Sequence, residues 1–487
     1  MKLKQVINHI PYTVLKGNLD GNIEGIAYDS RQVKPGFLFV CITGFTTDGH
    51  LYAEQAVAQG AVAVLAEREI DVPGTVTLVC TENTRLALPI LASNFYNEPS
   101  KDLRIIGVTG TNGKTTTTHL IQAILQEAGK KTGIIGTLYT RIDDYEHEIG
   151  RTTPEALEIE EFMDIVRRHH GDGVVMEVSS HALDLGRVDK INFDVAVFTN
   201  LTQDHLDYHK TMEEYKNCKL KLFKQIPAAD NTFCIINADD AYAADFINTA
   251  GALAYTYGIS QSADVKAVNL KTGLKGTKFK VNYSGGSFDI NIQLIGLFSV
   301  YNALAAIAFA LKEGIAPAVI KAALQKVKGV PGRFEQVDAG QDFTVIVDYA
   351  HTPDGLENIL TTAKQLVEKR LITVFGCGGD RDKTKRPLMG EIAARYSDFT
   401  VVTSDNPRSE EPQAIINDII PGVEKVAGAR YAIIVDRREA IRHAVTLARK
   451  GDMVVIAGKG HETYQLVKGQ VLDFDDRIVA TEYLKGK

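Results

Sequence analysis

Short apolar runs separated by polar turns fill the first hundred residues. Three of these runs are rich in β-branched and aromatic residues and predict strands, at 37–42, 61–65 and 76–79. A helical stretch at 53–59 lies between the first two runs. Proline and small polar residues at 97–102 predict a linker. The pattern therefore predicts a first, small α/β domain over residues 1–100.

Strands alternate with helices in the next part of the chain. The apolar run 103–108 predicts a buried strand, and a glycine-rich turn and a helix over 115–128 follow it directly. Runs at 173–178 and 194–199 are short, continuous and rich in valine, which is typical of strands buried in a parallel sheet. This alternation predicts a doubly wound α/β sheet in a central domain over residues 101–331.

The alternation continues beyond Gly332. Helical segments separate four further predicted strands, which lie at 344–348, 371–375, 399–403 and 452–457. They predict a second, smaller α/β domain of Rossmann-like type over residues 332–487. The expected fold class is therefore a three-domain α/β protein, in which a central doubly wound sheet is flanked by two smaller α/β domains.

Composition narrows the possible partners. The 487 residues carry a net charge of −7 and the 54 lysines and arginines form no long basic run, so no nucleic-acid partner is expected. No stretch approaches the ~20 apolar residues of a membrane span, and the N-terminus lacks an apolar core of signal-peptide length. The five cysteines are odd in number and far apart, which favours a reducing cytosol over a disulfide framework or a zinc site. We expect a soluble, cytoplasmic protein.

A glycine-rich turn lies between the first central strand and its helix, where a nucleotide triphosphate loop belongs. Glycines let backbone N–H groups turn toward phosphate oxygens, and the helix N-terminus adds partial positive charge. Lys114 would bridge the terminal phosphates, and the Thr115 hydroxyl would ligate Mg²⁺. The candidate ATP-binding residues of this segment are Gly110, Thr111, Asn112, Gly113, Lys114, Thr115 and Thr116.

The turn departs from the strict phosphate-loop pattern. That pattern requires glycine five residues before Gly113, where this chain has Val108, with Gly107 one residue further back. The alternative interpretation is an ordinary glycine-rich strand-to-helix turn. The Gly-Lys-Thr sequence at the right junction favours a variant ATP-binding loop, and hence a P-loop ATPase-like central sheet.

Polar side chains also follow two further predicted strands. Glu177 ends one of them, and ligands of parallel sheets bind at the carboxyl edge, so Glu177 is a candidate Mg²⁺ ligand. His205 lies just beyond the strand at 194–199 and could bind metal or orient the γ-phosphate. The alternative for this second segment is a surface loop rich in polar residues.

Three lysines lie close together on the helix predicted from residue 212. They are Lys216, Lys219 and Lys221. Taken alone, they are most simply solvent-facing lysines. A functional role for any of them needs evidence from elsewhere in the chain.

Short motifs rich in Gly, Asp, Asn, Arg and His are spread over essentially the whole chain. They lie at 29–31, 110–115, 152–154, 177–181, 199–205, 302–305, 332–335, 348–351, 378–381, 405–408 and 458–462. Their joint occurrence in this order resembles the Mur ligases, relatives of folylpolyglutamate synthetase. Within that family the chain is similar to members that add the third residue of the stem peptide. The resemblance implies an ATP-dependent amide-bond ligase of peptidoglycan precursor synthesis.

The resemblance implies ATP as co-substrate and Mg²⁺ as cofactor. Asn302, Arg333 and Asp348 are implied to contact the nucleotide, Asp348 through the ribose. Lys219 matches the lysine that the family carries as a carbamate, which would turn a cation into a Mg²⁺ ligand and reverses the solvent-facing interpretation. The implied catalytic residues are Lys114, Glu177, His205 and Lys219, and the implied metal ligands are Thr115, Glu177, His205 and carbamylated Lys219.

The resemblance also implies how the acid substrate, UDP-MurNAc-L-Ala-D-Glu, is held. The first domain would bind its UDP end, with Ser30, Thr46, Thr47 and Asp48 as candidates. The muramoyl-dipeptide would contact Thr152, Thr153, Ser179 and Arg187. We expect the enzyme to act as a monomer on small-molecule substrates alone.

Arg408 indicates which amino acid is added. Its guanidinium is a planar fork suited to a carboxylate, and meso-diaminopimelate has a second carboxylate at its far end that lysine lacks. The resembled lysine-adding enzymes differ at this motif, so the arginine favours diaminopimelate. The alternative is an arginine that merely caps a turn after Pro407. The residues implied to hold the amino acid are Arg381, Asp405, Asn406, Pro407, Arg408, Gly458 and Glu462.

The implied reaction converts a carboxylate into an acyl phosphate, from which an amine displaces phosphate. No Ser-His-Asp or Cys nucleophile is required, and no motif suggests one. A folylpolyglutamate synthetase is the nearest alternative, but it would lack the elements at 29–31 and 46–49. A P-loop switch or binding protein, and a cell-wall interaction protein that has lost catalysis, are alternatives of other classes.

Overall fold

The computed structural model describes residues 1–44, 47–147 and 150–486. The chain has three α/β domains, and its contacts divide it into two compact units. The first unit comprises Met1–Thr109, Gly129–Ala196 and Cys218–Phe233, and the second comprises Gly110–Ala128, Val197–Asn217 and Cys234–Lys487. The predicted domain boundaries after residues 100 and 331 stay a prediction.

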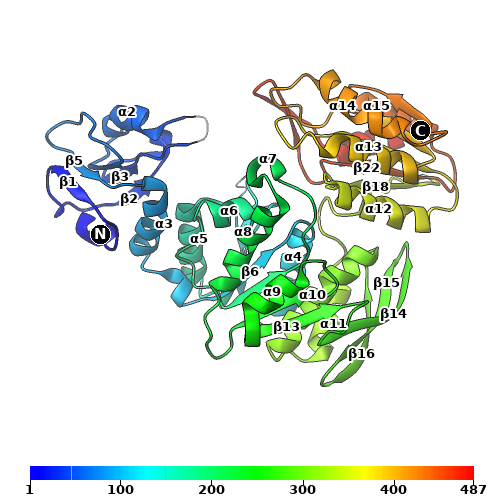
Figure 1. The fold of residues 1–487 in the computed structure, drawn as a ribbon, viewed down its shortest axis with the longest axis horizontal. Coiled ribbons are helices and arrows are strands. Elements are labelled where there is room, and N and C mark those ends of the chain that lie inside the picture. The colour runs from blue at the N-terminus through cyan, green and yellow to red at the C-terminus, as the bar shows by residue number, and fades with distance from the viewer. Residues whose placement is uncertain (45–46, 148–149, 487) are drawn as a thin grey trace. The chain divides into compact units, whose positions relative to one another are not determined.

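The N-terminal domain is built on a five-stranded sheet (Figure 1). Its strands are β1 Thr13–Lys16, β2 Gly25–Ala27, β3 Phe37–Val40, β4 Ala63–Ala66 and β5 Thr77–Cys80, and its helices are α1 Leu3–Val6, α2 Ala53–Ala58 and α3 Thr84–Phe95. The strand order is β1-β5-β4-β3-β2, with only β1 antiparallel to its neighbour. Leu38 and Val40 pack with α1 and α3, whereas Phe39 packs with α2. This alternation is the two-residue period of a strand buried on both faces.

The first unit also contains the part of the central sheet that comes first in the chain. Its strands are β6 Arg104–Thr109, β7 Thr132–Ile135, β8 Thr140–Ile142, β9 Tyr145–His147 and β10 Gly173–Glu177, and its helices include α5 Ala156–Arg168 and α6 Ser180–Asp184. β10 lies parallel between β6 and β7, and β8 and β9 extend β7 in antiparallel fashion. Glu177 pairs with Val108, so the predicted strand-end acid lies at the carboxyl end of β6.

The second unit continues the central domain. Its strands include β13 Ala254–Gly258, β14 Val265–Gly273, β15 Gly276–Tyr283 and β16 Gly286–Ile292, and its helices are α4 Lys114–Glu127, α7 Leu206–His209, α9 Ala243–Ala250, α10 Leu297–Lys312 and α11 Pro317–Lys326. Three elements adjoin the unit boundaries: β11 Val195–Phe198, α8 Met212–Lys224 and β12 Phe233–Asn237. β12 and β13 are parallel, but β14, β15 and β16 form an antiparallel meander. The central domain is therefore mixed rather than purely doubly wound.

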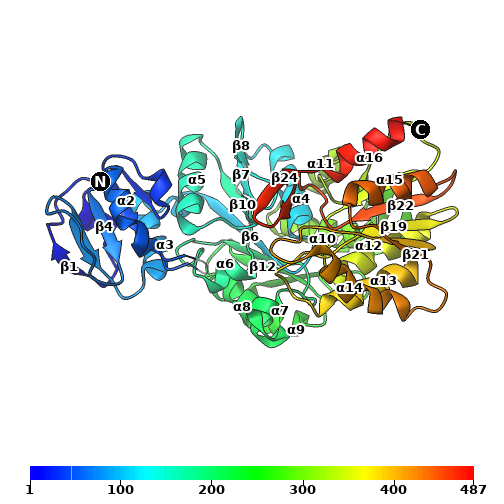
Figure 2. The ribbon, with the colours of Figure 1, turned by 90° about the horizontal axis from the view of Figure 1, so that it is seen from above.

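The C-terminal domain has a six-stranded sheet in the order β17-β18-β22-β19-β20-β21. Its elements are β17 Glu335–Gln336, β18 Thr344–Asp348, α12 Pro353–Leu366, β19 Leu371–Phe375, α13 Lys385–Tyr396, β20 Phe399–Val402, α14 Pro412–Glu424, β21 Tyr431–Ile433, α15 Arg437–Leu447, β22 Met453–Ala457, the hairpin β23 Tyr464–Val467 with β24 Gln470–Asp473, and α16 Asp476–Lys485. All neighbours are parallel except β17 and β18. Helices α12, α13 and α14 cover one face, and α15 and α16 cover the other (Figure 2). This domain is doubly wound, as the alternation predicts.

Glu160 is an uncharged acid in the core of the first unit. It lies on α5, which packs against α3, and is only 1% exposed. Burial raises the pKa of Glu160 to about 8, although a hydrogen bond with Ser93 opposes the shift. Between pH 4.5 and 8 the folded protein therefore retains a proton that the unfolded chain has released, so stability falls as pH rises.

Replacing Glu160 by glutamine is expected to remove this loss of stability. The amide cannot ionise, so the variant gains on the wild type by about 1.4 kcal/mol for each pH unit between these two pKa values. Thermal unfolding and hydrogen exchange of α5, followed from pH 5 to pH 9, measure the difference. Glu69→Gln, at an exposed carboxylate, is the control. A gap that does not widen with pH would contradict the assignment.

Candidate active site

The glycine-rich turn after β6 requires its glycines. Gly110 and Gly113 have φ of +153° and +85°. A Cβ on Gly110 would lie 1.9 Å from the Thr199 hydroxyl oxygen, and one on Gly113 would lie 2.3 Å from Asn302 Oδ1. Both positions therefore exclude any side chain, because backbone conformation and space each forbid it.

Polar contacts from the segment after β11 hold the turn. Asn200 accepts hydrogen bonds from two backbone N–H groups of the turn, from Thr111 to its carbonyl and from Asn112 to its side chain, both at 2.9 Å. The Thr199 hydroxyl donates to the Asn112 carbonyl at 2.7 Å. The turn is thus fixed by its neighbours before any ligand binds, which is the preorganisation that a phosphate site requires.

Lys114 is the first residue of α4. Its ammonium group donates to the carbonyls of Gly110 and Thr111, both at 2.8 Å, so it lies back over the turn. The helix N-terminus adds partial positive charge at the same place. The structure thus brings a cation, a helix N-terminus and a glycine turn together, and these are the features expected of an anion-binding site.

Arg333 reaches this turn from the start of the C-terminal domain. Its guanidinium donates to the Thr115 hydroxyl oxygen at 3.1 Å and lies over the Tyr349 ring, 4.6 Å from the centroid. Asn112 donates to Asp354 on α12 at 2.7 Å. Both domains thus contribute side chains to the phosphate turn.

A cavity of about 300 Å³ opens beside the turn. Its polar wall includes Asn302, Arg333 and Asp348, three predicted nucleotide contacts, and its apolar wall includes Phe298 and Ile359. Asp348 is buried and accepts hydrogen bonds from the N–H groups of Phe334 and Ala350 at 2.6 and 2.7 Å. Burial raises the pKa of Asp348, although Arg333 and these hydrogen bonds oppose the shift. The structure therefore brings these residues and the turn to one nucleotide-sized space.

Sequence reasoning missed part of this cavity. Asp239, Asp240 and Tyr301 also line it. The Asp239 carboxylate accepts hydrogen bonds from the backbone N–H groups of residues 259–261 and from the Tyr301 hydroxyl. It therefore orders the loop at the edge of the cavity. The available signal was the run of polar residues directly after β12, at the carboxyl end of a buried strand.

His205 lies in a charged group of the second unit. It is in the left-handed region, with φ of +57°, and its ring lies 3.4 Å from Asp204. Asp204 is buried and also lies 3.6 Å from Lys385 on α13. Burial alone would raise the pKa of Asp204, but attraction to His205, Lys385 and His351 outweighs burial and lowers it. His205 is therefore part of an organised cluster rather than an isolated residue of a surface loop.

The predicted contacts of the muramoyl-dipeptide gather around Glu177. This carboxylate is fully buried and accepts hydrogen bonds from the backbone N–H and hydroxyl of Thr137 at 2.8 and 3.1 Å. Thr137 also contacts Thr152, and Thr153 donates to the Glu177 carbonyl at 2.8 Å. Ser179 and Arg187 also contact Thr153. The Thr153 hydroxyl oxygen accepts a hydrogen bond from the Ser179 N–H, and the Thr153 carbonyl accepts one from the Arg187 guanidinium.

The interpretation of Lys219 as solvent-facing is wrong. It is 1% exposed and is among the largest fully buried side chains. Lys216 is also buried, with ion pairs to Glu213 and Asp245, and only Lys221 is exposed. Burying a lysine ammonium is costly without specific stabilisation, so the position calls for a particular role. The pattern of charged residues did not predict the burial of Lys219, because it holds no information on which side chains tertiary packing covers.

The predicted UDP-site residues lie in two groups of the N-terminal domain. Ser30 is buried and donates to Gln55 at 3.0 Å. Asp48 accepts hydrogen bonds from Arg68 and His50. Both hydrogen bonds lower the pKa of Asp48, and the one from Arg68 has the larger effect. The Thr47 hydroxyl contacts Tyr52 at 3.2 Å. Thr46 lies outside the described residues.

Two arginines, Arg381 and Arg408, lie near each other at the carboxyl edge of the C-terminal sheet. Arg408 has φ of +54° and is held by backbone hydrogen bonds to Leu466 and Lys468 of the hairpin. Its guanidinium donates to the Gly379 carbonyl at 2.8 Å. Burial and the nearby Arg381 cation lower the pKa of Arg408. A carboxylate placed between the two guanidinium groups would relieve their repulsion.

The other predicted amino-acid residues lie in two loops at this edge. Asn406 donates to Glu462 at 2.8 Å and accepts from Lys459 at 3.1 Å. Gly458 has φ of +120°, and a Cβ there would lie 2.6 Å from Asp405 Oδ2. Burial raises the pKa of Glu462, opposed by Lys459. Pro407 links Asn406 to Arg408. The loops after β20 and β22 therefore form one site.

Matches with known families assign the class of protein. Residues 22–96 match the Mur ligase family catalytic domain, 108–310 match the Mur ligase middle domain, and 332–460 match the Mur ligase glutamate ligase domain. The chain belongs to the Mur ligase family of ATP-dependent enzymes that join an acid to an amino acid.

The relatives narrow this class further. The chain is 62% identical to the UDP-N-acetylmuramoyl-L-alanyl-D-glutamate–2,6-diaminopimelate ligase of Syntrophomonas wolfei, with 100% of each chain covered. It is 51% identical to the ligase of that name from Bacillus licheniformis, covering 99% of this chain and 98% of the relative. A solved structure of a ligase with the same name aligns at 33% identity and a TM-score of 0.67, covering 100% of this chain and 99% of the other.

Proposed function

We propose that this chain ligates meso-2,6-diaminopimelate to UDP-MurNAc-L-Ala-D-Glu, consuming ATP and releasing ADP and phosphate. The observation that carries the proposal is the contact of Arg333 with Thr115, at 3.1 Å, beside the cavity that Asp348 also lines. Two domains thereby build one phosphate site, as a ligase that passes a phosphoryl group to a second substrate needs. The names of the relatives support the same acid and amino acid.

The reaction requires activation of the acid. A free carboxylate resists attack by an amine, because its charge and resonance oppose the nucleophile. Transfer of the γ-phosphoryl group makes an acyl phosphate, from which the amine then displaces phosphate. Such transfer depends on alignment and charge neutralisation rather than on a covalent protein group. Lys114 and Arg333 supply the positive charge, and the backbone N–H groups of the turn orient the phosphates.

Magnesium suits the donors available. Mg²⁺ prefers oxygen ligands, and Thr115 presents a buried hydroxyl at the phosphate turn. When bound, the ion would neutralise phosphate charge. Glu177, His205 and Lys219, the last as a carbamate, stay predicted ligands. Among the described residues no group of three or more His, Cys, Asp and Glu side chains is arranged to hold a metal.

The remaining predicted residues would hold the two substrates that are joined. The cluster around Glu177 offers hydroxyl groups and the Arg187 cation, which suit a sugar and a peptide carboxylate. Arg381 and Arg408 suit the distal carboxylate of diaminopimelate, and Asp405 and Glu462 suit its ammonium group. Ser30, Thr47 and Asp48 stay candidates for the UDP end.

The proposed setting is a monomer in the cytoplasm. The reaction consumes ATP, and no disulfide links any of the five cysteines in the described chain, which supports a reducing compartment. In the described parts of the chain, no helix combines the length and the apolar character needed to span a bilayer.

Phosphate release should depend on both co-substrates. With ATP, Mg²⁺ and UDP-MurNAc-L-Ala-D-Glu, addition of meso-diaminopimelate is expected to start steady release, and lysine or no amino acid to give little. Lysine lacks the charged group that the arginines would bind, and a site built for such a group rejects analogues without it. Slow ATP hydrolysis unaffected by either co-substrate would instead indicate a P-loop switch or binding protein.

A further inference from the structure

Arg437 is a fully buried arginine that none of the predicted sites includes. It is the first residue of α15 and 0% exposed in its side chain. Its guanidinium makes a two-pronged ion pair with Asp476 at the start of α16, with hydrogen bonds of 2.8 and 2.7 Å. Both partners are completely enclosed. Burying two charges is expensive, and apolar side chains would fill the space at lower cost, so the pair calls for an explanation.

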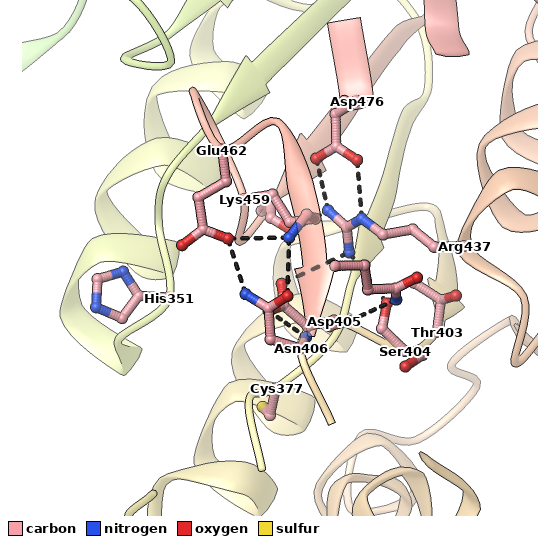
Figure 3. Close-up of polar contacts among 12 residues, drawn as sticks. His351, Cys377, Thr403, Ser404, Asp405, Asn406, Arg437, Lys459, Glu462 and Asp476 are labelled. Carbon is pink, nitrogen blue, oxygen red and sulfur yellow. Dashed lines mark hydrogen bonds and ion pairs between the residues drawn. The ribbon is translucent and has the colours of Figure 1, made fainter. Parts of the chain in front are cut away.

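The guanidinium also joins the ends of two strands. It donates to the Ala457 carbonyl at the end of β22, at 3.0 Å, and to the Ser404 carbonyl just after β20, at 3.4 Å. These strands are not neighbours, because β19 lies between them. The two loops of the amino-acid site begin at these two points, at Asp405 and at Gly458. Arg437 therefore sets the separation of the loops at their bases (Figure 3).

Asp405 is a second acid close to Arg437. Its Oδ1 accepts from the Asn406 N–H at 2.6 Å, and its Oδ2 lies 3.8 Å from the guanidinium. That distance is too long for a hydrogen bond. Among the described residues Asp405 Oδ2 has no hydrogen-bond partner although it is buried. Gly458 faces this oxygen, and any Cβ there would meet it at 2.6 Å.

Asp476 explains why the guanidinium does not bind Asp405 directly. It binds Nε and Nη2 and so fixes the orientation of the guanidinium, in which the third nitrogen, Nη1, donates to the Ser404 carbonyl and stays 3.8 Å from Asp405 Oδ2. Lys459, the other buried cation, is likewise engaged by Asn406 and Glu462. The cluster holds two cations, Arg437 and Lys459, and three acids, Asp405, Glu462 and Asp476. One negative charge thus exceeds the cations when all are ionised.

We propose that Arg437 and Asp476 are positioning residues for the amino-acid substrate. Arg437 holds the two loops at their bases through the Ser404 and Ala457 carbonyls, and Asp476 restrains Arg437 so that the outer oxygen of Asp405 stays open to an ammonium group. The pair thereby tunes affinity for the amino end of the diamino acid without touching it. This inference rests on the proposed function, because it assumes that the loops after β20 and β22 bind an amino acid.

The test is the Asp476→Asn variant, which preserves size. With the neutral amide, the Arg437 fork is released and turns to Asp405, where it competes with the substrate ammonium. The KM for meso-diaminopimelate in the phosphate-release assay is expected to rise about tenfold or more. The KM values for ATP and UDP-MurNAc-L-Ala-D-Glu are expected to stay within about twofold, since their site does not include this pair. Asp476→Glu should recover part of the affinity.

A matched control joins the same two helices. Arg438 on α15 and Glu482 on α16 form an ion pair at the surface, with both side chains about half exposed. Glu482→Gln therefore removes a helix-to-helix ion pair outside the cluster. It is expected to leave all three KM values unchanged. If Asp476 only held the helices together, the two variants would differ in thermal stability but not in the KM for diaminopimelate.

Arg437→Lys provides a second route if Asp476→Asn does not fold. Lysine keeps the positive charge but cannot bind Asp476 and both strand-end carbonyls at once. The same selective rise in the KM for diaminopimelate is expected. Unchanged KM values in the folded variants, or an equal rise for all three substrates, would overturn the inference. A wild type without diaminopimelate-dependent phosphate release would instead refute the proposed function.

Discussion

Replacing Lys114 by alanine is expected to abolish ligation, lowering phosphate release with both co-substrates by about a thousandfold or more. Lys114 is the cation of the phosphate turn, where its ammonium group lies against the carbonyls of Gly110 and Thr111. Removing it would leave a bound triphosphate with one protein cation fewer, while the turn keeps its own hydrogen bond to the Asn200 side chain. Binding of ATP should weaken less than turnover falls, because the lost charge matters most as the phosphoryl group is transferred.

Lys130→Ala is the matched control for this prediction. Lys130 follows the C-terminal end of α4 and pairs at the surface with Asp172. Its replacement removes one lysine of the same charge at the other end of the helix, and activity should stay within about twofold. Circular dichroism and thermal unfolding should match the wild type for both variants. Product formation that survives Lys114→Ala would refute the assignment of this turn as the phosphate site.

The strands were the most predictable part of the fold. The predicted runs at 344–348 and 371–375 coincide with β18 and β19, and 173–178 overlaps β10 except for its last residue. These strands are buried on both faces, so their continuous apolar sequence is a direct consequence of their position. The meander of β14, β15 and β16 was not predicted, because its solvent-facing side chains interrupt the apolar runs that identify buried parallel strands.

The site was predictable where chemistry is concentrated in short segments. The glycine turn and the Asp405–Arg408 run each carry several functional groups within a few residues, and the structure brings each to the carboxyl edge of its sheet. Lys219 illustrates the limit of local pattern. A helix with three lysines appears solvent-facing until the burial of each one is known, and two of the three, Lys216 and Lys219, are buried.

Long-range partners lay beyond sequence reasoning. Arg437 and Asp476 are 39 residues apart, and Arg333 and Thr115 are 218 residues apart. Neither pair lies within one motif, and an arginine that opens a helix has no feature that distinguishes it from a surface residue. What unites these pairs is the crossover of parallel strands, which brings segments distant in the chain to the same edge of a sheet.

Arg408→Ala is expected to abolish use of meso-diaminopimelate while leaving ATP and UDP-substrate binding nearly intact. The half-buried guanidinium is fixed by its hydrogen bond to the Gly379 carbonyl and lies near Arg381, so it meets a carboxylate without reorganising. Truncation removes the fork and leaves the distal carboxylate of the substrate in a partly buried site with one cation. The loss in kcat/KM for diaminopimelate could reach about 10⁴, the factor by which sites built to bind a polar group reject partners that lack it.

Two further comparisons separate recognition of the carboxylate from a local effect on the loop. Arg408→Lys keeps the charge but loses the planar fork, so it should recover only part of the activity. Arg395→Ala, at an exposed ion pair with Glu391 on α13, should behave as the wild type. The Arg408 backbone is in the left-handed region and is held by the hairpin. A purely structural role would therefore lower the melting temperature and affect all substrates equally.

Equal use of lysine and diaminopimelate by the wild-type enzyme would defeat the assignment, because the fork would then recognise nothing that distinguishes the two amino acids.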